Sequence, residues 1–187
     1  MDKPRVRLQY PCSGFTLWEL LCALLIAGVA LGLGVPSFEG IVLDSRRTAE
    51  INAFVTAIQL ARSEASKRRR PIVLCKTVDG YQCGGPELSF DAGWMVFVND
   101  DDARPPHRSV TEPLLLHHTP SSAGPIHANR ARFEFRPFRH RNTNGTVTFC
   151  DRRGAPEARA VIISYTGRPR AAGVGPGGRP LICAGLT

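Results

Sequence analysis

Apolar and polar positions divide the chain into an N-terminal part with helical spacing and a longer part with short apolar runs. Sixteen residues without a charged side chain run from Leu20 to Val35. Together with neighbouring apolar residues they predict a helix over 15–37, long enough to cross a bilayer of roughly 30 Å. Over 38–70, apolar side chains recur every three or four residues, which predicts an amphipathic continuation of this helix. We expect it to end at a run of four basic residues before Pro71.

After the predicted helix, turn residues separate seven short apolar runs, each of which predicts a strand. Asp79-Gly80 and Asn144-Gly145 have the composition of hairpin turns. A long helix followed by a series of strands predicts an α+β fold, with residues 71–187 forming one β-rich globular domain. The predicted strands are Ile72–Cys75, Trp94–Val98, Leu114–His117, Ala131–Phe135, Thr146–Cys150, Ala160–Tyr165 and Pro180–Cys183.

The start of the apolar run carries a more specific signal. Three basic residues precede Gly14, and Glu19, the fifth residue after that glycine, places a carboxylate close to the start of the run. A carboxylate among apolar side chains is costly and requires a cation as its partner. The sequence Gly14-Phe15 followed by Glu19 strongly resembles the prepilin leader of type IV pilins and type II secretion pseudopilins.

This resemblance implies that residues 1–14 are a leader peptide. A prepilin peptidase would cleave after Gly14 and methylate Phe15, and Glu19 would then pair with the terminal amine of a neighbouring subunit in a filament. The subunit would be held in the inner membrane by one span, with a periplasmic domain, before it joins a pilus at the cell surface. The competing interpretation is an ordinary signal anchor that contains an acidic residue.

Six cysteines are present, one in the predicted leader and one in the apolar helix. The other four, Cys75, Cys83, Cys150 and Cys183, form an even set in an exported domain, which predicts two disulfides. Of the three possible pairings, Cys75–Cys83 is favoured because it closes a hairpin, and Cys150–Cys183 because it holds the C-terminus. The alternative is that these cysteines bind zinc, although their spacing lacks a Cys-x-x-Cys pair.

Positive charge is concentrated in the last third of the chain. The whole chain has 24 Lys and Arg against 16 Asp and Glu. Residues 44–129 contain ten basic and ten acidic residues, whereas residues 130–187 contain eleven arginines and three acids, a net charge of +8. Arginine remains charged and matches the geometry of phosphate oxygens. A one-sided basic surface is typical of proteins that bind a polyanion.

Several short motifs occur in the order found in one branch of the pilin family. Ala61–Ala65, Val73–Cys75, Gly93–Val98, Phe149-Cys150 and Cys183 resemble the FimT/GspH branch of minor pilins and pseudopilins. That resemblance runs from the predicted leader almost to the C-terminus. It implies a long N-terminal helix packed on a domain of antiparallel strands, membership of a pilus or pseudopilus, and no enzymatic role.

Gly167-Arg168-Pro169-Arg170 follows the sixth predicted strand, so we expect it on an exposed turn. Proline between the two arginines stiffens the backbone and holds their side chains apart. The tetrapeptide resembles the Gly-Arg-x-Arg motif with which FimT-type minor pilins bind DNA during natural transformation. A solvated basic loop, or one that contacts acidic lipid headgroups, is the alternative. The predicted DNA-binding residues are Arg168, Arg170 and Gly167, with Arg136, Arg139, Arg141, Arg152, Arg153 and Arg179 around them.

Other chemistry receives little support from the sequence. Asn99–Asp102 lacks the spacing of a calcium loop and is interpreted as an acidic turn. His117 and His118 are adjacent on a predicted strand, so they would point to opposite faces and are interpreted as surface histidines. No hydrolase, zinc-protease or phosphate-loop motif is present, and we expect neither an enzyme nor a cofactor or metal.

The resulting hypothesis is a minor pilin that binds extracellular DNA through phosphate contacts, independently of base sequence, for uptake in natural transformation. Few exposed aromatic residues are expected for base stacking, which favours double-stranded DNA. The alternative hypothesis is a structural minor pilin, or a pseudopilin of a type II secretion system, that serves assembly without binding DNA.

Overall fold

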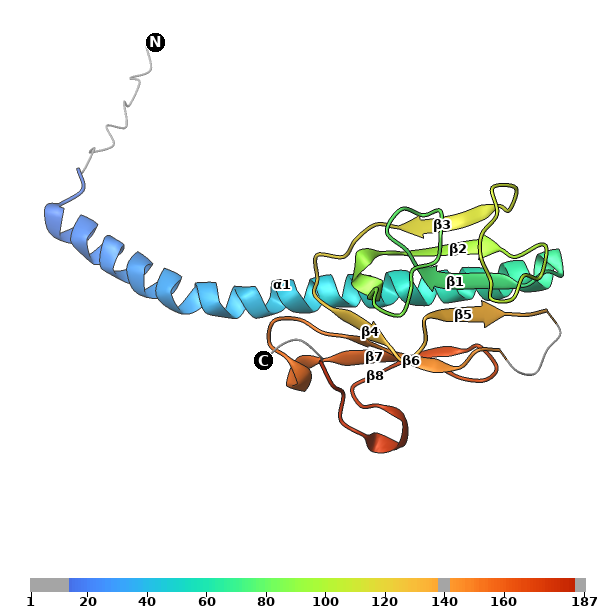
Figure 1. Cartoon of the computed structure of the whole chain (residues 1–187). Helices are drawn as coiled ribbons and strands as arrows, with labels where there is room; N and C mark the ends of the chain where they lie inside the picture. The colour runs from blue at the N-terminus through green and yellow to red at the C-terminus, as the bar shows by residue number, and fades with distance from the viewer. Residues whose placement is uncertain (1–13, 138–141, 184–187) are drawn as a thin grey trace, which may run out of the picture. The chain divides into compact units, whose positions relative to one another are not determined.

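The computed structural model describes residues 14–137 and 142–183, except for the side chains of residues 33–37 (Figure 1). The chain divides into two compact units, Met1–Ile41 and Val42–Thr187. A single helix, α1 (Leu17–Arg68), belongs partly to each unit. The second unit contains eight strands in addition to the end of this helix. This combination confirms the predicted α+β fold.

In the first unit, Thr16 caps the start of α1. The Glu19 backbone N–H donates to the Thr16 hydroxyl at 3.3 Å, and Glu19 lies in the first turn, where its negative charge interacts favourably with the positive end of the helix dipole. The large apolar side chains of this unit are exposed, with Phe15 75% and Leu25 69% accessible. Among the residues that the structure describes, no helix has the length and apolar character needed to cross a membrane.

In the second unit, the amphipathic spacing of α1 places one face in the core. Phe54, Ile58, Ala61 and Ala65 are buried, whereas polar residues between them remain exposed. The helix ends at Arg68 because Arg69 adopts a left-handed conformation with φ 56°, which breaks the hydrogen-bond pattern of the helix. Basic side chains of the last turn pair with Glu64.

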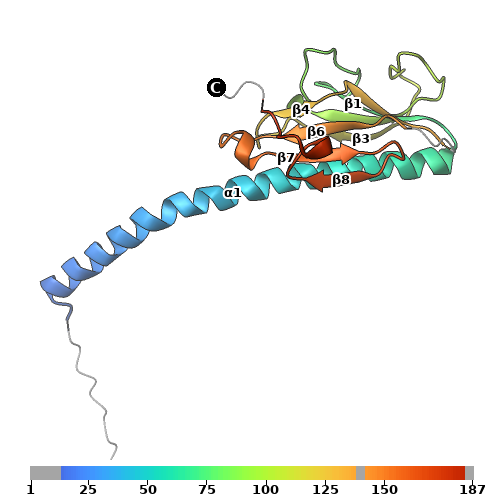
Figure 2. The same cartoon turned by 90° about the horizontal axis from the view of Figure 1, so that it is seen from below.

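The strands form two four-stranded antiparallel sheets, one with the order β3-β2-β1-β5 and the other with the order β4-β6-β7-β8. Figures 1 and 2 show the C-terminal half of α1 running alongside the strands. Three short 3-10 helices interrupt the loops, including η1 (Phe90–Ala92). The strands are β1 (Ile72–Lys76), β2 (Trp94–Val98), β3 (Leu114–His118), β4 (Ile126–Ala128), β5 (Arg132–Phe135), β6 (Gly145–Phe149), β7 (Arg159–Ile163) and β8 (Pro169–Ala172).

The core joins one face of α1 to both sheets. Phe54 is fully buried, and its ring meets four other aromatic rings at centroid distances of 5.4 to 6.3 Å in edge-to-face orientations. Such pairs add to the stabilisation that burial of apolar area provides. The four rings belong to η1, β2, β5 and β6 and are those of Phe90, Trp94, Phe133 and Phe149.

Both favoured disulfides are present. Cys75 at the end of β1 is bonded to Cys83 in the loop before β2, and Cys150 after β6 is bonded to Cys183. Each bond attaches an irregular segment to a strand end. The remaining cysteine of the described residues, Cys22, is free and exposed.

Four local predictions are wrong. Residues 180–183 do not form a strand, and the C-terminal edge strand is instead β8. The weakly apolar segments that form β4 and β8 were not predicted. Asn144-Gly145 is not a hairpin turn, because β5 and β6 belong to different sheets. Gly145 is needed for space: a Cβ there would lie 2.8 Å from the Phe133 ring. Asp79-Gly80 is not a hairpin turn either, because it lies in the long loop between β1 and β2, although Gly80 has a positive φ of 73°.

Candidate nucleic-acid interface

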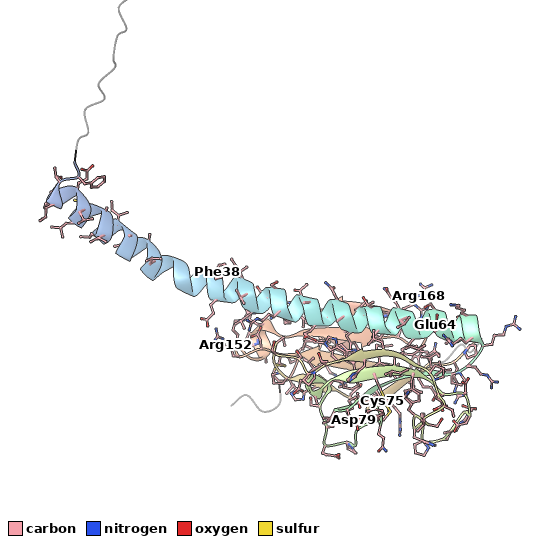
Figure 3. All side chains as sticks on the ribbon, turned by 90° about the horizontal axis from the view of Figure 1, so that it is seen from above. Phe38, Glu64, Cys75, Asp79, Arg152 and Arg168 are labelled. Atoms are coloured by element: carbon pink, nitrogen blue, oxygen red, sulfur yellow. A yellow bond between two sulfur atoms is a disulfide. The ribbon has the colours of Figure 1, made fainter. Side chains whose placement is uncertain are left out.

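The hairpin between β7 and β8 positions the Gly-Arg-Pro-Arg motif. The turn is closed by hydrogen bonds from the Gly167 N–H to the Ser164 carbonyl at 2.8 Å and from the Ser164 N–H to the Arg168 carbonyl at 3.1 Å. The Ser164 hydroxyl accepts the Arg168 N–H at 3.2 Å. The backbone on both sides of Arg168 is therefore fixed, while its side chain is exposed (Figure 3).

Gly167 is buried and serves the turn rather than a ligand. Its φ of 74° is disfavoured for other residues, and a Cβ would lie 3.2 Å from the Phe135 ring and 3.1 Å from Nδ2 of Asn142. The Asn142 N–H also donates to the Tyr165 carbonyl at 2.8 Å. The hairpin turn is thus packed against the segment next to β5.

Arg170 lies on strand β8 and not on the turn, which corrects the sequence prediction. It pairs with Ile162 of β7, and β8 is the edge strand of its sheet. The Arg170 side chain is exposed. Within the described part of the chain, neither Arg168 nor Arg170 forms an ion pair with an acidic residue. Both guanidinium groups therefore retain their capacity to bind an external anion.

Arg136 is in a different situation, because acidic neighbours already bind it. Its guanidinium group donates to Asp102 at 2.5 Å and also forms an ion pair with Glu134. The hydrogen bond between Arg136 and Asp102 raises the pKa of Arg136 and lowers the pKa of Asp102. The Arg136 side chain is only 16% exposed. Its charge is largely compensated inside the protein.

Arg153 belongs to a network that fixes helix α1 to the loop after β6. Arg153 pairs with Asp151 at 2.7 Å and with Asp44 at 2.6 Å. Arg47 pairs with the same two carboxylates, at 3.0 and 2.7 Å, and also donates to the Glu157 carbonyl. Hydrogen bonds with Asp151 and Asp44 raise the pKa of Arg153. Arg153 is therefore mainly a structural residue.

Of the other predicted arginines, Arg152 and Arg179 are exposed. Arg139 and Arg141 lie outside the described residues. The hairpin and edge strand bring two of the exposed arginines together, Arg168 and Arg170, hereafter the hairpin arginines.

The comparisons with known proteins address the family. The family model described as Type II transport protein GspH matches residues 50–167, more than half of the chain. The chain belongs to the GspH family. It is thus a member of the pilin and pseudopilin class. The search of the curated proteins found no match to the chain.

Two crystal structures of the Pseudomonas aeruginosa PAO1 type IV minor pilin FimU are similar to this GspH-family chain. One is 22% identical, with a TM-score of 0.49, and the alignment covers 72% of this chain and 90% of FimU. The other is 21% identical, with a TM-score of 0.48, and covers 69% and 91% respectively.

The family match ends at Gly167, directly before the hairpin arginines. Membership of the GspH family therefore accounts for α1 from residue 50 and for strands β1 to β7, but carries no information on DNA binding. At the N-terminus, Gly14, Phe15 and Glu19 are exposed, and cleavage, methylation and assembly at these residues remain predictions. The membrane span predicted over 15–37 also remains a prediction.

His118 is not a simple surface histidine. Its ring stacks on the buried Trp94 at a centroid distance of 3.8 Å, and its Nε2 lies 3.0 Å from the Glu50 carboxylate on α1. Neighbouring His117 is exposed. In the described ranges, no group of three or more His, Cys, Asp and Glu is arranged to hold a metal ion.

Proposed function

We propose that this GspH-family chain is a minor pilin of a type IV pilus that binds extracellular DNA for uptake in natural transformation. The observation that carries the proposal is the exposure of Arg168 and Arg170 on a fixed hairpin, without an acidic partner among the described residues. Exposed arginines bind phosphate oxygens by bidentate, charge-assisted hydrogen bonds. Because phosphate contacts read no bases, binding is independent of DNA sequence.

The remaining charge supports this proposal by long-range attraction. Residues 130–187 carry a net charge of +8, and some of these arginines are exposed, including Arg179. An uncompensated basic surface raises the association rate with a polyanion and makes binding depend on salt. Arg136 and Arg153 are omitted from the proposed contact set, since acidic residues already occupy their donors.

The N-terminal part of the proposal concerns assembly. A prepilin peptidase removes residues 1–14 and methylates Phe15, the apolar part of α1 holds the subunit in the inner membrane and then in the filament core, and Glu19 pairs with the amine of a neighbouring pilin. Mass spectrometry of the mature protein tests this part. A mature N-terminus other than Phe15 would refute it.

The DNA-binding part is tested with the full chain in mild detergent and a labelled duplex, by fluorescence anisotropy at several salt concentrations. Each phosphate contact contributes about 0.9 to the slope of log affinity against log salt. We expect the Arg168→Gln/Arg170→Gln variant to lose affinity for all sequences equally and to reduce that slope by about two. The matched control is Arg46→Gln/Arg130→Gln, which removes the same charge from exposed positions elsewhere. Equal affinity of both variants would refute the assigned site.

A second candidate function is favoured by the family description itself, which names a type II transport protein. In that case the chain is a structural pseudopilin or minor pilin that serves assembly, and the hairpin arginines are solvated. The same titration separates the two functions. Absence of DNA binding by the unmodified chain at low salt would favour the structural role.

A further inference from the structure

A recess in the second unit is lined by residues other than the hairpin arginines. It has a volume of 730 Å³ and runs between residues 82–86 of the loop that precedes β2 and residues 104–108 of the loop that follows it. Ala131 and Arg132, at the start of edge strand β5, complete its wall. We call this recess the loop groove.

The charged side chains that line the loop groove are all basic. Arg104, Arg108 and Arg132 contribute to its wall, and none of the described residues that line it is acidic. Arg104 pairs with Asp102 at 3.3 Å, but that carboxylate lies outside the wall. Across the described residues, Arg108 and Arg132 have no acidic partner. The groove therefore has an excess of positive charge that an anionic ligand could neutralise.

Arg108 provides a second, independent observation. Its Nε atom is buried and has no hydrogen-bond partner in the part of the chain that the structure covers. Buried donors are usually paired in folded proteins, and of the five buried side-chain atoms without a partner among the described residues, only that of Arg108 belongs to a residue that lines this recess. A carboxylate or other oxyanion in the groove could accept a hydrogen bond from it.

Both walls of the groove are fixed before any ligand binds. The disulfide from Cys83 to Cys75 and the hydrogen bond from the Gly84 N–H to the Lys76 carbonyl at 2.8 Å hold one wall. On the other wall, Nη1 of Arg132 donates to the Pro106 carbonyl at 3.2 Å. A preformed groove binds a ligand without the cost of ordering its loops.

The composition of the groove favours an acidic peptide over a single-stranded nucleic acid. Single-stranded nucleic acids bind through aromatic side chains on which bases stack, and no Phe, Tyr or Trp lines the described wall. The apolar part of the wall consists mainly of Pro86, Pro105 and Pro106, which lack backbone N–H donors. The polar side chains of the wall are Gln82, His107 and three arginines, and the guanidinium group of arginine matches a carboxylate in a bidentate manner.

We propose that the loop groove binds an extended acidic segment of a partner protein, with Arg108 and Arg132 pairing with its carboxylates. This interaction does not depend on DNA binding at the hairpin arginines. It provides the chain with a protein-binding surface formed by residues other than the hairpin arginines.

The test uses the full chain in mild detergent and a labelled hexapeptide of alternating Asp and Glu with blocked ends. We expect saturable binding, at least tenfold weaker for the corresponding Asn and Gln peptide. The Arg108→Gln/Arg132→Gln variant should bind the acidic peptide at least tenfold more weakly, whereas the charge-matched control Arg46→Gln/Arg130→Gln, at two exposed positions, changes affinity less than twofold. Arg168→Gln/Arg170→Gln should bind the peptide as the unmodified chain does.

Arg132 also holds the Pro106 loop, so the double variant could lose affinity through a loss of structure. The thermal unfolding midpoint of the double variant is therefore measured, and the single variant Arg108→Gln is tested beside it. Arg108 makes no ion pair with a described residue, so this single change should weaken peptide binding at least threefold without altering the midpoint. Unchanged affinity in Arg108→Gln, or no saturable binding by the unmodified chain, would overturn the proposal. It would also be overturned if a single-stranded oligonucleotide bound more tightly than the peptide and lost affinity in the same variants.

Discussion

The ion-pair network around Asp151 provides the sharpest prediction on stability. The Asp151 side chain is fully buried and accepts hydrogen bonds from Arg47 at 3.0 Å and from Arg153 at 2.7 Å. Arg47 is itself only 5% exposed. Replacing Asp151 by Asn keeps the shape of the side chain but removes the charge, which leaves the buried Arg47 guanidinium group with Asp44 as its remaining acidic partner.

Breaking one partner of a buried ion pair costs about 3–5 kcal/mol. Since Asp44 and the Glu157 carbonyl still bind Arg47, we expect Asp151→Asn to lower the free energy of unfolding by about 3 kcal/mol, near the lower limit of that range. The assay is urea unfolding of the full chain in mild detergent, followed by the fluorescence of the buried Trp94. A loss below about 1 kcal/mol, the value typical of exposed pairs, would refute the assignment of a buried network.

The pH dependence provides a second measurement on the same variant. Hydrogen bonds from Arg153 hold the pKa of Asp151 below its ordinary value. A carboxylate with a lowered pKa adds stability above its unfolded pKa, and that stability is lost as the pH falls through the folded pKa. The unmodified chain should therefore lose stability on acidification below pH of about 4, and the Asp151→Asn variant should lose less. Parallel acid profiles for the two proteins would contradict this explanation.

Three further predictions concern the core, the hairpin and the disulfides. Phe54→Ala should lower the free energy of unfolding by about 3–5 kcal/mol in urea unfolding because Phe54 is fully buried among four rings, whereas the exposed Thr56→Ala should change it by less than about 0.5 kcal/mol. Gly167→Ala should destabilise the chain by about 1–3 kcal/mol, since φ is 74° and the Phe135 ring is close to the added Cβ. The same variant should bind DNA more weakly in the anisotropy assay because the turn that positions Arg168 is strained. Unchanged affinity would show that DNA binding does not depend on the conformation of this turn. Cys150→Ser/Cys183→Ser should cost about 4 kcal/mol and Cys75→Ser/Cys83→Ser about 2.5 kcal/mol in urea unfolding, because the separations are 33 and 8 residues; the reverse order would contradict the loop-entropy argument.

The sequence predicted the elements whose side chains repeat with the period of their structure. Helical spacing at Phe54 and Ile58 identified the buried face of α1, and compact apolar runs identified strands such as β1 and β2. Strand β8 was not predicted because Pro169–Ala172 has no apolar alternation and is held by pairing with β7 alone. An exposed edge strand of this kind does not require alternating apolar and polar residues, so its sequence does not identify it as a strand.

The sequence identified candidate arginines for the site but not the acidic residues that pair with some of them. Composition identifies arginines and not their partners. Arg47 and Asp151 are separated by 104 positions in sequence, so no local spacing connects them, and only the fold reveals that Arg47 and Arg153 share two carboxylates. The same reason explains why Arg136 was grouped with DNA-binding residues although Asp102 and Glu134 bind it.

Arginines that pair with acidic residues inside the protein contribute differently to function from arginines that do not. The net charge of +8 counts every arginine equally, but an external anion binds mainly to arginines that have no acidic partner in the protein. Arg47 and Arg153 stabilise the contact between α1 and the loop after β6, so their removal should reduce stability more than DNA affinity. Arg168 and Arg170 lie beyond the matched family segment on a hairpin whose backbone is already fixed, so their removal should reduce affinity and leave stability almost unchanged. Two variants with the same net charge should therefore have opposite effects, which a dependence on total charge alone cannot produce.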